Sequence, residues 1–293
     1  MTPKVSIILL SALRWNLTRR CLNSIQAHTN GVSYEIIIVD MGGSEDAKQG
    51  LMEYAARDSR LRLLMHTENH GPAKGRNLAL AEAIGDFIVF LDNDTIVCPG
   101  WLDALLYAAE TQPKYGLYGG KLVCPNDYIY FCSRNIVDEV RDHTRFVGIH
   151  VTVPYRRDDP AVCNEESVPW YPTGCLLGRK EDLHTIGGFD ERFRFVEEDK
   201  DLCFRMRTAG KPVLYVPACE VIHDRGQDDV YDTTIRYNNI REIQENIRLF
   251  EKVWDCCIEL VYSRTCLEKV GYSPAMIDSI TDGPLREFFT VLS

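Results

Sequence analysis

The apolar run from Phe87 to Leu91 constrains the fold of this chain more than any other sequence feature. Five consecutive apolar residues predict a short strand buried on both faces, as in a parallel sheet that helices cover. Asp92 and Asp94 follow the run directly. Open α/β sheets bind ligands at the carboxyl ends of their strands, and carboxylates at the edge of a core are costly unless a cation or another partner compensates them. The sequence therefore predicts a divalent-metal site there, with a nucleotide diphosphate as the candidate ligand.

The composition is that of a globular protein, and its charge argues against a nucleic-acid binder. The 293 residues are 45% hydrophobic and 26% charged, enough for one large α/β domain with additions. The net charge of −10 opposes binding to nucleic acid and broad adhesion to anionic membranes. No apolar segment is long enough to span a membrane, and the first apolar run is too short for a signal peptide. The eleven cysteines include no CxxC pair, so we expect reduced thiols in a cytoplasmic protein, with any membrane contact peripheral.

Strand-like and helix-like segments alternate over the first 120 residues, which is typical of βαβ units. Polar residues follow three of these predicted strands, namely Ser11, Asp40 and the Asp92/Asp94 pair. We expect strands at 5–10, 34–39, 61–65 and 87–91 and helices at 17–27, 46–57, 72–83 and 99–111. Further along, we expect strands at 128–131, 146–153, 212–216 and 219–222 and helices at 198–209 and 231–266.

Six motifs occur in a fixed order along the chain: Val39–Ser44, Asn69–Asn77, Phe90–Asp94, Gly187–Glu191, Glu198–Leu202 and Val216–His223. Together they resemble family 2 glycosyltransferases of the GT-A fold, over about three quarters of the sequence. The resemblance implies an α/β fold with a Rossmann-like mixed central sheet flanked by helices. It divides the chain into a glycosyltransferase domain over 1–228, with a nucleotide-binding half (1–120) and an acceptor and catalytic half (121–228). Residues 229–293 are predicted to form a C-terminal helical extension.

The resemblance also implies a site for a nucleotide-diphospho sugar, with UDP as the favoured nucleotide and dTDP next. A carboxylate is a pure hydrogen-bond acceptor, which suits the ring N–H of uracil at Asp40. Arg76 lies early in a predicted helix, where it suits either the diphosphate or a neighbouring carboxylate. Trp101 and Trp170 are candidates to stack on sugar rings, and a place in the core is the alternative for each. The expected nucleotide-sugar-binding residues are Ser11, Asp40, Arg76, Asp92, Asn93 and Gly174.

The same resemblance assigns a cation and a catalytic base. Asp94 and His223 are the expected ligands of Mn²⁺ or Mg²⁺, and Asp92 contacts the ribose or a metal-bound water. Among the acids Glu198, Asp199 and Asp201, the resemblance favours Asp199 as the base that deprotonates the acceptor. Clustered acids raise one another's pKa, which brings a carboxylate closer to working pH.

The predicted reaction is therefore metal-dependent sugar transfer, with inversion, to a hydroxyl of a glycan, lipid or other glycoconjugate. One alternative is an idle nucleotide-sugar-binding or scaffold protein of the same fold. The other is a nucleotidyltransferase, which would be expected to carry a glycine-rich, basic loop after the first strand. The segment from Leu9 to Trp15 lacks such a loop. The C-terminal helices could also serve a homo-oligomer.

Overall fold

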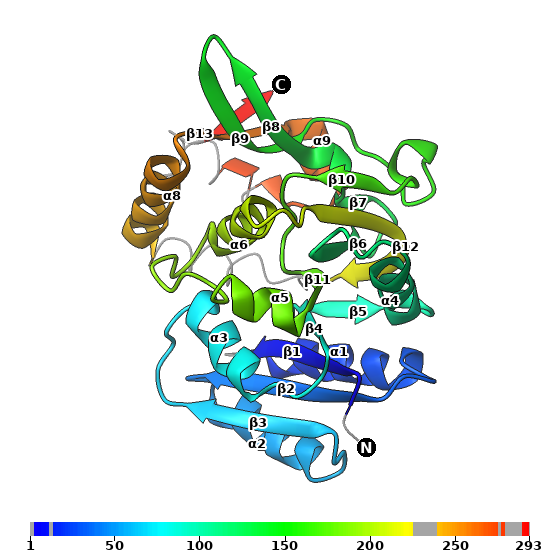
Figure 1. Cartoon of the computed structure of the whole chain (residues 1–293). Helices are drawn as coiled ribbons and strands as arrows, with labels where there is room; N and C mark the ends of the chain where they lie inside the picture. Colours follow the sequence, from blue (N-terminus) through cyan, green and yellow to red (C-terminus); the bar gives the residue numbers. More distant parts are fainter. Residues whose placement is uncertain (1–2, 12–13, 225–238, 275–276, 279–288, 293) are drawn as a thin grey trace.

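A large mixed sheet lies at the centre of the molecule (Figure 1). The computed structural model describes residues 3–11, 14–224, 239–274, 277–278 and 289–292. The strands of this sheet are β1 Val5–Ser11, β2 Tyr34–Met41, β3 Leu61–His66, β4 Phe87–Leu91, β5 Thr95–Val97, β6 Leu117–Val123, β7 Ile129–Phe131, β10 Glu166–Val168, β11 Cys175–Arg179 and β12 Val213–His223. Within the described residues they lie in the order β10-β12-β6-β11-β4-β1-β2-β3, with β5 beside β12 and β7 beside β6.

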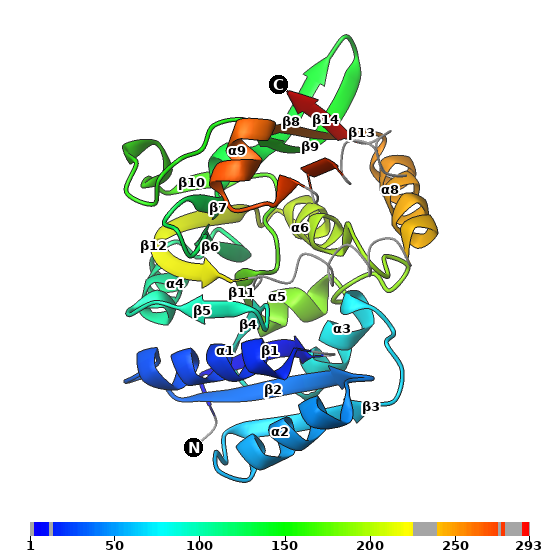
Figure 2. The ribbon, with the colours of Figure 1, turned by 180° about the vertical axis from the view of Figure 1, so that it is seen from behind.

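Helices cover both faces of this sheet, as the continuous apolar strands predict. The helices are α1 Trp15–His28, α2 Glu45–Ala55, α3 Pro72–Glu82, α4 Trp101–Thr111, α5 Lys180–Thr185, α6 Glu198–Thr208, α8 Ile240–Trp254 and α9 Arg264–Lys269. α1 and α2 lie on one face of β1, β2 and β3, and α3 lies on the other (Figures 1 and 2). The chain reverses direction across the sheet between β3 and β4, and a right-handed crossover then places α3 opposite the first two helices.

The parallel part of the sheet brings the predicted polar residues to one edge. β1 runs parallel to both β2 and β4, and β2 runs parallel to β3. In this register Ser11 lies opposite Asp40, and Leu9 lies opposite Leu91. The carboxyl ends of β1, β2 and β4 therefore meet, and Asp92 follows at the same edge.

The strand β12 connects this edge to the rest of the sheet. It pairs with β6 in parallel as far as Val216, shifts register, and resumes at Glu220. A Cβ atom on Gly120 of β6 would lie 2.5 Å from the Cys219 sulfur, so a glycine leaves the room that this irregularity needs. The last residues of β12 pair antiparallel with β5, and His223 lies opposite Thr95. This pairing carries His223 to the turn that holds Asp92 and Asp94.

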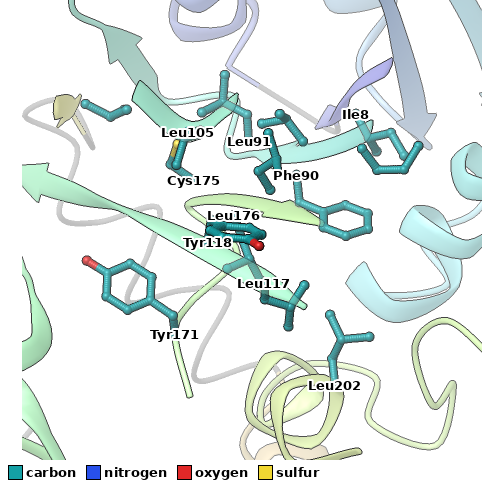
Figure 3. Close-up of a cluster of buried hydrophobic side chains, with 14 of the residues drawn as sticks. Ile8, Phe90, Leu91, Leu105, Leu117, Tyr118, Tyr171, Cys175, Leu176 and Leu202 are labelled. Carbon is teal, nitrogen blue, oxygen red and sulfur yellow. The ribbon is translucent and has the colours of Figure 1, made fainter. Parts of the chain in front are cut away.

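The core is continuous from β1 through β4, β11 and β6 to α6. Figure 3 shows Ile8, Phe90, Leu176 and Leu117 following one another across neighbouring strands, with Leu202 of α6 beyond them. Each of these five side chains is at most 1% exposed. The site residues are therefore mounted on a closely packed support, which restricts their movement.

The C-terminal segment differs from the predicted helical extension. Residues 240–254 form α8 as expected, but 257–263 form the strand β13, and the part of the predicted helix over 231–238 lies outside the described residues. β13 joins a second sheet of order β14-β13-β9-β8, with β8 Ile136–Arg141, β9 Thr144–Val151 and β14 Phe289–Leu292 (Figure 2). Its buried Ile258 and Leu260 alternate with the less buried Cys257, Glu259 and Val261, a pattern that fits a pleated surface better than a helix. Tertiary pairing with β9 thus overrides the helical periodicity that continues from α8.

None of the described helices is both long and apolar enough to cross a membrane.

Candidate active site

Asp92, Asp94 and His223 form a cluster at the carboxyl edge of the large sheet. One ligand atom from each residue lies within 4.8 Å of the others. The His223 Nε2 atom is 3.6 Å from Asp92 Oδ2 and 3.6 Å from Asp94 Oδ1. Atoms that share a cation at about 2.1 Å lie at such separations, and two carboxylates with one imidazole suit Mn²⁺ or Mg²⁺. The residues present therefore fit the divalent cation that the sequence predicts.

Hydrogen bonds to backbone oxygens hold the turn that carries the two aspartates. The Thr95 hydroxyl donates to the backbone oxygen of Asp92 at 2.6 Å, and the backbone N–H of Asp224 donates to the backbone oxygen of Asp94 at 2.8 Å. The His223 ring stacks on the Tyr130 ring, with centroids 4.2 Å apart and planes 6° apart. The cluster is thus ordered by protein contacts, and Tyr130 of β7 is a member that the sequence did not indicate.

The two carboxylates differ in their electrostatics. Burial raises the pKa of Asp94, and the nearby His223 offsets only part of this effect. Burial alone would also raise the pKa of Asp92, but hydrogen bonds and charge from His223 and Arg76 outweigh it and lower that pKa. Asp92 is therefore the carboxylate whose negative charge the protein itself compensates more fully.

At the other end of this edge, Ser11 and Asp40 present buried oxygens without partners. Asp40 is 0% exposed, and its Oδ2 accepts the Gly43 N–H at 3.2 Å, while its Oδ1 has no hydrogen bond within the described residues. The Ser11 hydroxyl, 2% exposed, lacks one in the same sense. Burial raises the pKa of Asp40. Buried polar atoms without partners are costly, so a ligand that bonds to them would gain affinity.

Arg76 connects the cluster of Asp92, Asp94 and His223 to the acidic start of α6, where the predicted base Asp199 lies. Its Nη1 donates to Glu198 Oε1 at 2.8 Å, and its Nη2 lies 3.4 Å from Asp92 Oδ1. The guanidinium also lies over the Phe189 ring, 5.5 Å from its centroid. Of the two roles considered for Arg76, the structure shows the pairing with carboxylates. Glu198, which is buried, has its pKa raised to about 7 by burial and by repulsion from Asp199, against the opposing charge of Arg76.

Asp199 and Asp201 occupy different environments although both belong to α6. Asp199 lines a cavity and accepts one hydrogen bond, from the Lys200 N–H at 2.7 Å. Burial raises the pKa of Asp199. Asp201 is 1% exposed, and its two oxygens accept from Arg205 at 2.7 Å and from the Trp254 ring nitrogen at 3.1 Å. The structure thus places Asp199 at the cavity, whereas both oxygens of Asp201 accept hydrogen bonds within the protein, one of them from Trp254 of α8.

Asn93 and Gly174 lie beside the cluster of Asp92, Asp94 and His223. The Asn93 side-chain amide donates to the Thr18 hydroxyl at 2.7 Å, a contact that fixes the turn to α1. A Cβ atom on Gly174 would lie 2.9 Å from Leu122 and 3.4 Å from the Asp92 carboxylate. A side chain at this position would displace the end of the Leu122 side chain and lie in contact with the Asp92 carboxylate, so Gly174 keeps space open beside the cluster.

The two candidate stacking tryptophans are both in the core. Trp101 is 0% exposed and donates from its ring nitrogen to the Thr29 hydroxyl at 3.0 Å. Trp170 is 1% exposed, with the Lys200 ammonium 4.7 Å from its ring centroid, and it contributes to the wall of the cavity beside Asp199. The alternative of a core position is therefore the correct one for Trp101. Trp170 therefore contacts α6 through Lys200 at the wall of the cavity.

Solved structures resemble this fold closely enough to compare architecture. A crystal structure of GalNAc-T7 with UDP, GalNAc and Mn²⁺ aligns with a TM-score of 0.61 and 16% identity, covering 76% of this chain and 43% of that one. The mannosyltransferase PcManGT from Pyrobaculum calidifontis, in complex with GDP-Man and Mn²⁺, aligns with a TM-score of 0.57 and 18% identity, covering 85% and 65%. The predicted GT-A architecture, a mixed central sheet flanked by helices, is confirmed.

Sequence comparisons agree with this architecture. A pre-mycofactocin glycosyltransferase of Mycobacterium tuberculosis is 28% identical over 189 residues, which are 64% of this chain and 37% of the relative. An N-acetylglucosaminyl-diphospho-decaprenol L-rhamnosyltransferase of the same organism is 30% identical over 214 residues, covering 65% of this chain and 66% of the relative. The chain therefore spans less than two thirds of the length of either relative. The sequence model of glycosyl transferase family 2 matches residues 6–181, more than half of the chain, and the protein belongs to that family.

Proposed function

We propose that this protein transfers a sugar from a nucleotide-diphosphate donor to an acceptor hydroxyl, with inversion at the anomeric carbon and with Mn²⁺ or Mg²⁺ bound. One observation carries the proposal: a three-residue cation site and an available carboxylate flank the same arginine. Arg76 contacts Asp92 of the metal-binding cluster on one side and Glu198, the neighbour of Asp199, on the other. This arrangement would hold a donor diphosphate and an acceptor hydroxyl next to each other.

Asp94 and His223 would hold the cation, with Asp92 either as a third ligand or as a partner of a bound water. A divalent cation supplies Lewis acidity there and compensates the charge of the leaving diphosphate. Two similar structures are described with Mn²⁺ together with UDP or GDP-Man, which supports the choice of ion and of ligand class.

Asp40 and Ser11 would bind the nucleotide base. The free Asp40 Oδ1 is a buried acceptor that suits the ring N–H of uracil, and the Ser11 hydroxyl can donate or accept. Thymine has the same ring N–H, so UDP-sugars are the first choice and dTDP-sugars the second.

Asp199 would act as the base in a single displacement. Its carboxylate takes the proton of the acceptor hydroxyl, and the oxygen attacks the anomeric carbon from the face opposite the diphosphate. The bond between the anomeric carbon and the phosphate oxygen breaks, and its electron pair leaves with the nucleoside diphosphate. The raised pKa of Asp199 makes its carboxylate a better proton acceptor than an ordinary aspartate. The acceptor class is a glycan, lipid or other glycoconjugate.

A panel of UDP-sugars and dTDP-sugars, incubated with Mn²⁺ and followed by release of the nucleoside diphosphate, tests the proposal. Asp199→Asn should reduce this hydrolysis by about 10²- to 10⁴-fold, the usual contribution of a general base, while UDP binding stays unchanged. Asp86→Asn is the matched control, because Asp86 lies exposed at the opposite end of β4. If none of the donors is bound or hydrolysed with any divalent ion, the proposal that this protein is a glycosyltransferase is refuted. Loss of UDP binding in Asp199→Asn would refute the assignment of the base.

A further inference from the structure

A cavity of about 450 Å³ lies between α6, α8 and the second sheet, directly beside Asp199. Its walls come from segments that are far apart in the sequence. β9 precedes the acidic residues of α6, whereas α8 and β13 belong to the C-terminal segment. α8 packs on α6 through the contact of Phe250 with Phe204, whose ring centroids are 5.5 Å apart. The C-terminal segment therefore does more than cover the catalytic half, since it completes a cavity at the proposed base.

The acidic and basic side chains at this cavity come from the consecutive residues Glu197 to Lys200, and most of them form ion pairs. Glu197 and Lys200 form a buried ion pair, with the ammonium 2.7 Å and 2.9 Å from the two carboxylate oxygens. Glu198 is bonded to Arg76. Of the three carboxylates Glu197, Glu198 and Asp199, that of Asp199 accepts its only hydrogen bond within the described part of the chain from a backbone N–H.

Away from these acidic and basic residues, the described lining is largely hydrocarbon. It includes the side chains Ile149, Val151, Ile243, Ile247, Leu260 and Tyr262. Ile149 and Tyr262 are only partly buried by the protein, so part of their surface faces the cavity. A sugar ring placed against the aliphatic side chains of these walls would lose hydrogen bonds to water without replacing them there, whereas an apolar group would gain from leaving water.

We propose that this cavity binds the acceptor, and that the acceptor carries an apolar alkyl or aryl group next to the hydroxyl that receives the sugar. The inference rests on the proposed function, since Asp199 identifies the end of the cavity where the hydroxyl lies. The hydroxyl faces Asp199, and the apolar group lies between β9, β13 and α8. An acceptor made only of sugar units leaves these apolar walls unmatched.

Binding of three glucosides to the full chain tests this inference without a donor. Octyl, 4-nitrophenyl and methyl β-D-glucopyranoside share the sugar and differ in the apolar group, and isothermal titration below the micelle concentration measures each affinity. We expect the octyl or the nitrophenyl compound to bind at least tenfold more tightly than the methyl compound. The tighter of the two shows whether the cavity takes an alkyl or an aryl group. Equal affinity of all three, or no binding, overturns the inference.

Variants of Ile149 locate the binding site. Ile149→Asn places an amide in the apolar wall, and Ile149→Phe narrows the cavity while keeping the wall apolar. Each should reduce the preference for the tight-binding glucoside by at least tenfold. Val140→Asn, at a 69% exposed position of the same sheet, should leave it unchanged. UDP binding reports folding, and Ile149→Phe remains informative if the asparagine variant does not fold. An unchanged preference in a folded Ile149 variant refutes the placement.

The two proposals fail in different ways. If donor hydrolysis is present but the glucosides bind alike, the proposed transferase stands and the acceptor class is wrong. If no donor is bound or hydrolysed, the transferase fails, whatever the glucosides do.

Discussion

Replacing Arg76 by Met tests whether this arginine holds the site together. The side chains of Arg76 and Glu198 are each 9% exposed, and their ion pair measures 2.8 Å. Removing one partner of a buried ion pair costs about 3–5 kcal/mol, because the remaining charge stays buried without compensation. Asp92 keeps its contact with His223 in the variant. We therefore expect the free energy of unfolding to fall by an amount near the lower end of this range, about 3 kcal/mol at pH 8.

The loss should depend on pH, because Glu198 can take up a proton instead. Burial and repulsion from Asp199 raise the pKa of Glu198 from 4.5 to about 7 in the presence of Arg76, and removal of the arginine raises it further. Between pH 4.5 and 7 the folded state of wild type and variant alike binds more protons than the unfolded chain, so both free energies of unfolding fall together as pH rises. Above pH 7 only the variant's Glu198 still binds its proton, so the free energy of unfolding of the variant continues to fall. The difference between wild type and variant should therefore be small at pH 5.5 and large at pH 8.

Urea denaturation at the two pH values measures both effects. The control is Arg57→Met, since the Arg57 side chain is 80% exposed and lies 3.9 Å from Glu53, where such a pair contributes at most about 1 kcal/mol. Adding Glu198→Gln to Arg76→Met removes the buried charge and should recover most of the loss. A loss below about 1 kcal/mol at pH 8, as for an exposed pair, or an equal loss at both pH values, would refute the reasoning.

Three further changes test other parts of the site. Asp94→Asn should weaken Mn²⁺ binding at least tenfold in calorimetry, and Asp86→Asn at the far end of the strand should bind as the wild type does; equal affinities would exclude Asp94 as a ligand. Asp40→Asn should weaken UDP binding by about 1–3 kcal/mol, because a buried acceptor becomes partly a donor. Unchanged binding would mean that Asp40 does not contact the nucleotide base. Trp254→Phe leaves buried Asp201 one donor short and should lower the free energy of unfolding by about 1–3 kcal/mol in urea, with donor hydrolysis unaffected. Reduced hydrolysis in this variant, if it remains folded, would favour Asp201 over Asp199 as the base.

The sequence predicts the parallel part of the fold well, because its signals are local. Strands buried on both faces appear as unbroken apolar runs, and the run from Phe87 to Leu91 forms β4 with the same bounds. The motifs after these strands place Asp40, Asp92 and Asp94 at one edge, since parallel strands end on the same side.

What the sequence could not predict depends on contacts between distant segments. The strand β13 begins three residues after the end of the helix α8, and its pairing with β9 decides its conformation. The role of Asp201 depends on Trp254, which is 53 residues away.

The position of His223 depends on the number of residues in the irregular part of β12. β12 contributes residues 217–219 between two registers where β6 contributes none, and Gly120 leaves space for them. Side chains alternate between the faces of a sheet, so removing one residue from 217–219 would turn the imidazole away from Asp92 and Asp94. Removing two would restore its direction but draw it back along the strand by about 7 Å. In this chain, the length of the segment 217–219 therefore sets whether His223 lies close enough to share a cation with the two aspartates.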